Sequence, residues 1–147
     1  MRKAVIFLTI IFFTNLIGAI YFNAYLTWWF DMLHHFWGGF FVAMLMAHYL
    51  KITELQITNY PASPRPESSE AGELRQIQKY LIIVGAVSFI GIVWEFAEYL
   101  AGQTLIEPIY NNFGVRAYFI GDLDDTINDL LMDVLGALIF LLTFKRR

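Results

Sequence analysis

Charged residues are scarce in this chain, and cysteine is absent. Of its 147 residues, 16% are charged and 58% are hydrophobic, whereas about a quarter of the residues in an ordinary soluble domain are charged. The absence of cysteine excludes a disulfide scaffold, thiolate metal ligands and cysteine catalysis. A net charge of -3 provides no basic face for nucleic acid. The composition therefore predicts a membrane protein that does not bind nucleic acid.

Four long stretches contain no charged residue at all: 4–30, 32–50, 80–94 and 134–144. Around them we predict membrane spans near residues 4–26, 32–50, 80–101 and 126–144, each long enough as a helix to cross about 30 Å of hydrocarbon. The first stretch follows two basic residues, as a secretory signal does, but its apolar core is longer than that of a usual signal. We therefore predict an all-α membrane protein, a four-span antiparallel transmembrane bundle that forms a single domain over 1–147.

Basic residues fall almost entirely on one side of this four-span arrangement. Nine of the ten lie in 1–3, 51–79 and 145–147, and only Arg116 lies on the other side. Since cytoplasmic loops carry the excess of lysine and arginine, we predict that both termini and the 51–79 segment are cytoplasmic. This segment holds three of the four prolines and charges that cancel, so we expect a flexible linker.

Small residues occur at helical spacing within the last three predicted spans. Because glycine and alanine let membrane helices approach closely, we expect most of them to serve helix packing. The residues concerned are Gly38, Gly39, Ala43, Ala47, Gly85, Ser88, Gly91, Gly136 and Ala137.

Ionisable residues gather at the outer ends of the second, third and fourth predicted spans. Three separate parts of the sequence reach this depth, and within each part the spacing is three or four residues, which places side chains on one helix face. The sets are Asp31 with His34 and His35, then Glu95 with Glu98, then Asp122, Asp124, Asp125, Asp129 and Asp133. We predict that six of them converge on one pocket open to the outer leaflet, with acids aimed into the core of the bundle: Asp31, His35, Glu95, Glu98, Asp125 and Asp129.

Four of these acids lie inside predicted spans, where each charge costs roughly 3 kcal/mol at the bilayer centre, so the set would cost on the order of 10 kcal/mol. Divalent cations, protonation or a wet cavity must offset this cost. We predict a divalent metal site, for Mg²⁺, Ca²⁺, Mn²⁺ or Zn²⁺. Its predicted ligands are Asp31, His35, Glu95, Asp122, Asp125, Asp129 and Asp133.

Two alternatives apply to single members of this set. Asp122 or Asp124 could instead cap the positive end of the last helix, and for Asp124 we favour that role. His34 and His35 cannot face the same way on one helix. We favour His35, because it lies four residues after Asp31.

The motifs around these residues resemble those of the YjdF-like family of bacterial inner-membrane proteins and, more distantly, the VanZ-like family associated with teicoplanin resistance. The resemblance rests on DMLHHFWGGF from residue 31, WEFAEY from residue 94 and GDLDDTINDLLMDVLGA from residue 121. The positions that match the family pattern are Asp31, His35, Glu95, Asp129 and Gly136. At Asp133 the YjdF-like pattern tends to have a small residue. The resemblance implies a bacterial inner-membrane protein but brings no biochemical activity with it.

Three functions fit these residues. The first is a metal-dependent activity on a phosphate-bearing lipid or lipid-linked cell-envelope precursor; its hydrolytic form has Glu98 as general base and Arg116 holding the phosphate. The second is a proton- or cation-coupled transporter or channel subunit, for which acids within the membrane are also typical. The third is a structural cation without catalysis. The expected partners are membrane lipids, and the sequence is also compatible with a homo-oligomer.

Overall fold

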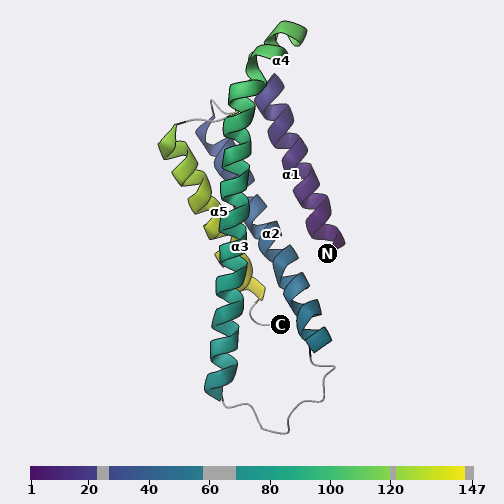
Figure 1. Cartoon of the computed structure of the whole chain (residues 1–147), viewed down its shortest axis with the longest axis vertical. Helices are drawn as coiled ribbons and strands as arrows, with labels where there is room; N and C mark the ends of the chain where they lie inside the picture. Colours follow the sequence, from purple (N-terminus) through teal and green to yellow (C-terminus); the bar gives the residue numbers. More distant parts are fainter. Residues whose placement is uncertain (23–26, 58–68, 120–121, 145–147) are drawn as a thin grey trace.

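The computed structural model describes residues 1–22, 27–57, 69–119 and 122–144, most of which are helical and none of which is in a strand. The all-α prediction is therefore confirmed for this part of the chain. Figure 1 shows long helices in alternating directions and one short helix at an end of the bundle. The helices are α1 (Arg2–Tyr21), α2 (Trp28–Ile57), α3 (Ser69–Thr104), α4 (Ile106–Phe113) and α5 (Leu123–Phe144).

Three of the described helices are long and apolar enough to cross a membrane. They are α1, the Gly72–Thr104 part of α3, and α5. At 30 residues α2 is also long enough, but it does not reach the same hydropathy, because Asp31, His34 and His35 lie in its first turns. The structure thus supports three of the four predicted spans by length and composition.

The helices next to the predicted linker are longer than expected. We expected a flexible segment over 51–79, but α2 continues to Ile57 and α3 begins at Ser69. The 69–79 part is rich in Glu, Ala, Leu, Arg and Gln, which have high helix propensity, so the helix continues past its apolar part. The prolines of this segment lie outside the described residues.

The short helix α4 was not expected either. It follows α3 after Leu105 and ends at Phe113. The next residue, Gly114, caps the helix with a φ of 67°, which lies in the left-handed region. The amide of Gly114 donates to the carbonyl of Tyr110, a common way to end a helix at glycine. This helix lies at the opposite end of the bundle from the C-terminal end of α2 and the start of α3 (Figure 1).

The closest packing is between α2 and α5, and it depends on two glycines. A Cβ atom on Gly39 would overlap the backbone of Asp133, and one on Gly136 would overlap the carbonyl of Phe36. The predicted packing role of small residues is confirmed at these two positions. It is wrong for Gly85, where an added Cβ would meet nothing within 4 Å.

Candidate metal-binding site

Six ionisable side chains meet inside the bundle, two from each of three helices. None of them is more than 6% exposed, although all are polar. They are Asp31 and His35 of α2, Glu95 and Glu98 of α3, and Asp129 and Asp133 of α5. The i, i+3 and i, i+4 spacing within each helix places each pair on one face, and the α2–α5 contact brings two of the faces together.

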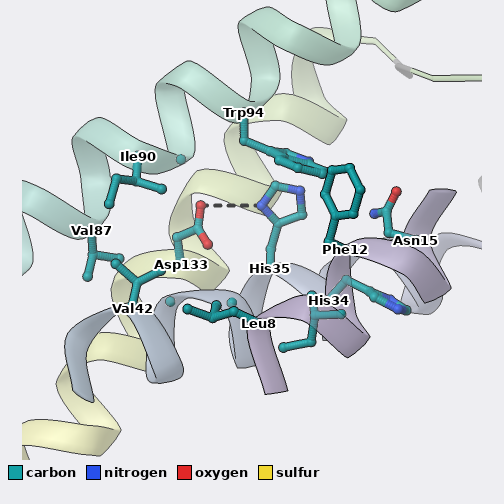
Figure 2. A pocket seen from close by; sticks show the side chains of 14 residues that line it. Leu8, Phe12, Asn15, His34, His35, Val42, Val87, Ile90, Trp94 and Asp133 are labelled. Atoms are coloured by element: carbon teal, nitrogen blue, oxygen red, sulfur yellow. Dashed lines mark hydrogen bonds and ion pairs between the residues drawn. The ribbon is translucent and has the colours of Figure 1, made fainter. Parts of the chain in front are cut away.

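His35 lies at the centre of this cluster. Its Nε2 atom is 3.5 Å from Oε1 of Glu95 and 3.9 Å from Oδ1 of Asp31. Its other ring nitrogen, Nδ1, is 3.3 Å from Oδ2 of Asp133 and donates a hydrogen bond to it (Figure 2). With the proton on Nδ1, the lone pair of Nε2 faces the remaining carboxylates.

Three polar side chains that the sequence analysis did not assign to the site support these acids. Asn15 of α1 donates from Nδ2 to Oδ1 of Asp31 at 3.1 Å, and Trp94 donates from Nε1 to Oε1 of Glu98 at 2.8 Å. Thr126 makes a side-chain hydrogen bond to Glu95. Asn15 had a signal in the sequence, since it is a lone amide within an apolar run. Trp94 also had a signal, since Glu98 lies four residues later in the same helix. Thr126 had none, because its role depends on the neighbouring helix α3.

Four buried atoms of the cluster have no hydrogen-bond partner within the described part of the chain. They are Oδ2 of Asp31, Nε2 of His35, Oε1 of Glu95 and Oδ1 of Asp129. A buried polar atom without a partner costs about 1–3 kcal/mol, so native proteins seldom leave several together. Carboxylate oxygens and imidazole nitrogen are also the ligands that divalent cations take in proteins.

Two sets of three residues have the spacing needed to hold an ion. In each set, one ligand atom per residue lies within 4.8 Å of the others. The sets are Asp31, His35 and Asp129, and His35, Glu95 and Glu98. They share His35, so one ion between them, or two ions side by side, would draw ligands from all three helices. The site therefore has the residue types and the spacing of a carboxylate-rich metal centre.

A family model matches almost the whole chain. A family described as "Predicted membrane protein (DUF2238)" matches residues 2–147. The chain belongs to this family. YjdF-like proteins are the same family, so that resemblance is confirmed, whereas a relation to VanZ-like proteins is not shown. No curated protein and no solved structure matches this DUF2238 chain.

Asp122, Asp124 and Asp125 of the DUF2238 chain lie at the start of α5, outside both sets of three. Asp122 is exposed, and its Oδ1 accepts a hydrogen bond from the amide of Asp125 at 3.1 Å. An aspartate directly before a helix that binds the amide three residues on is an N-cap. The capping alternative considered for Asp122 is thus what the structure shows. Asp124 is exposed and Asp125 half-buried.

His34 and Arg116 also lie away from the cluster. His34 donates from Nδ1 to the carbonyl of Phe30 at 2.8 Å, and its Nε2 lies 3.0 Å from Oγ1 of Thr14. Its ring points away from that of His35 (Figure 2). Arg116 is exposed, with its guanidinium 6.0 Å from the centre of the Tyr110 ring. Of the two histidines, only His35 belongs to the described cluster.

Proposed function

We propose that this DUF2238 protein binds a divalent cation between α2, α3 and α5. The observation that carries the proposal is a group of four atoms without a hydrogen-bond partner in the described part of the chain. They belong to Asp31, His35, Glu95 and Asp129, each at least nine-tenths buried. Each atom has a free electron pair that a cation held by one or other of the two sets of three could use. The cation would also offset the repulsion between carboxylates that lie close together.

The contact between His35 and Asp133 supports the same proposal. Histidines that bind metals usually donate their second ring N–H to a carboxylate or carbonyl, which fixes the tautomer and the ring orientation. Asp133 accepts the Nδ1 proton of His35 in this way. In this proposal Asp133 orients His35 and does not itself bind the cation.

We propose that α2 also spans the membrane, which gives four spans with α1, α3 and α5. We further propose that the membrane is a bacterial inner membrane and that both termini are cytoplasmic. The basic residues of 1–3, 51–79 and 145–147 support this orientation. So does the arrangement in Figure 1, where α1 and α3 run toward the end that carries α4, and α2 and α5 run the opposite way. In this orientation the acidic cluster lies in the outer half of the bilayer.

We propose that the protein binds a phosphate-bearing lipid or cell-envelope precursor. If the protein is an enzyme, it hydrolyses this molecule. A cluster of five acids repels a phosphate unless a cation reverses its sign, so phosphate binding requires the metal. Glu98 is buried beside His35 and Glu95, a place from which a carboxylate can take a proton from water at the metal. Arg116 is an exposed cation on the same outer side and could hold the phosphate as it approaches.

The test is the metal content and Mn²⁺ affinity of the purified protein, by mass spectrometry and electron paramagnetic resonance. We expect about one or two ions per chain, and loss of at least one ion in Asp129→Asn. The matched control is Asp124→Asn, which removes the same charge from an exposed position of the same helix. Equal metal content in both variants, or no ion in the unaltered protein, would refute the metal site. Proton or cation flux in vesicles without a divalent requirement would favour a transporter instead.

A further inference from the structure

A cavity of about 120 Å³ adjoins the cluster, between α1, α2 and α3. Its polar end is formed by Asn15, His35 and Asp133, and its walls are otherwise mainly apolar. Figure 2 shows His35 and Asp133 between the helices, with Leu8, Val42 and Val87 lining the other part of the same space. The cavity therefore has a polar end that is continuous with the proposed metal site and an apolar end that leads away from it.

The apolar end points toward the middle of the bilayer. Three helices each place one lining residue at the level of the cluster and one at a deeper level, and the two are seven residues apart. These pairs are Asn15 and Leu8 on α1, His35 and Val42 on α2, and Trp94 and Val87 on α3. Seven residues correspond to about 10 Å along a helix. The long direction of the cavity thus matches the direction in which a lipid of the outer leaflet extends, from headgroup to chain.

The cavity is also accessible from the lipid side. In the described part of the chain, the backbone of α1 comes close to that of α2 but not to that of α3 or α5, so α1 and α3 meet through side chains. The rings of Phe12 and Trp94 bridge α1 and α3 near the cluster, with centroids 5.8 Å apart. Deeper in the membrane, Ile90 lines the cavity while 41% exposed, so it stands at the opening. A hydrocarbon chain could enter there without crossing a polar surface.

We infer that this cavity binds the first carbons of a lipid chain whose phosphate group lies at the metal site. The inference rests on the proposed function, because the metal attracts the phosphate. The cavity volume of about 120 Å³ is close to that of an engineered cavity of about 150 Å³ that binds benzene, so it takes roughly six carbons. The remainder of the chain lies between α1 and α3 in the bilayer. The substrate class is thus a single-chain or polyprenyl-type phosphate, or one chain of a phospholipid.

The test uses Mn²⁺-loaded protein in lipid nanodiscs, titrated with inorganic phosphate and with monoalkyl phosphates from ethyl to decyl. Empty nanodiscs correct for partition of the probes into lipid. We expect the affinity to rise about fourfold per methylene group, the factor for burying a CH₂, and to level off at about six carbons. In Ile90→Trp, whose larger side chain covers the opening, the series should be flat.

The matched control is Ile92→Trp, which adds the same side chain two residues away, where the isoleucine is 55% exposed and does not line the cavity. This variant should keep the rise with chain length, and both variants should bind inorganic phosphate and Mn²⁺ as the unaltered protein does. A flat series in the unaltered protein, or the same series in both variants, would refute the chain site.

Failure of the proposed function gives a different result. If Mn²⁺ and inorganic phosphate do not bind, the metal proposal falls, and a series of uncharged alcohols from propanol to octanol then tests the cavity alone. If Ile90→Trp weakens alcohol binding and Ile92→Trp does not, the cavity is still a site for apolar chains, but for chains without a phosphate. Alcohol binding that neither variant changes would refute both proposals.

Discussion

Gly136→Ala tests whether the α2–α5 contact sets the geometry of the site. The added Cβ would overlap the carbonyl oxygen of Phe36 and crowd its carbon and the amide nitrogen of Phe40. These are backbone atoms, so they cannot rotate away as the end of a long side chain can. Overpacking of this kind costs about 1–3 kcal/mol of unfolding free energy. The same change at Gly85, where the Cβ meets nothing within 4 Å, should not lower the unfolding free energy through overpacking.

The comparison of Gly136→Ala with Gly85→Ala isolates this steric cost, because both changes gain the same intrinsic helix propensity. The assay is reversible unfolding of each variant by sodium dodecyl sulfate in mixed micelles, followed by circular dichroism. We expect Gly136→Ala to be less stable than Gly85→Ala by about 1–3 kcal/mol. Its Mn²⁺ affinity should also fall, because α5 carries Asp129 and Asp133 toward His35. Equal stability of the two variants would refute the reasoning.

Three further predictions concern the site and its orientation. Asp133→Ala removes the acceptor for Nδ1 of His35 and should weaken Mn²⁺ binding about 10–100-fold. Competition with a chelating dye measures this affinity. A loss of Mn²⁺ affinity no larger than in Asp124→Asn would contradict the orienting role of Asp133. Glu98→Gln should keep at least one metal ion but lower any turnover of a lipid phosphate, whereas equal turnover in this variant would exclude Glu98 as general base. Reporter fusions after Lys79 and after Gly102 should localise to opposite sides of the membrane; the same side for both would end the four-span arrangement.

Much of the fold follows from the sequence because a bilayer leaves the backbone few choices. Without water to bond, a spanning segment must satisfy its own N–H and C=O groups, so long apolar runs become helices. Charged polar segments carry no such constraint, which is why the extension of α3 to Ser69 and the short helix α4 were not predicted. The sequence also predicted that the acids of three helices lie at one level of the bundle, where the structure brings them together.

The sequence by itself indicated which side chains share a helix face and favoured His35 over His34 beside Asp31, a choice that the structure made. Spacing along one helix does not determine how that helix is rotated or how close its neighbours come. Only the tertiary structure decided that Asp133 accepts a hydrogen bond from His35 and that Asn15 reaches Asp31 from α1. The first contact exists because α2 and α5 touch at two glycines, and the second because α1 packs against α2. The cavity beside the acids lies where α1 and α3 meet through side chains without close backbone contact.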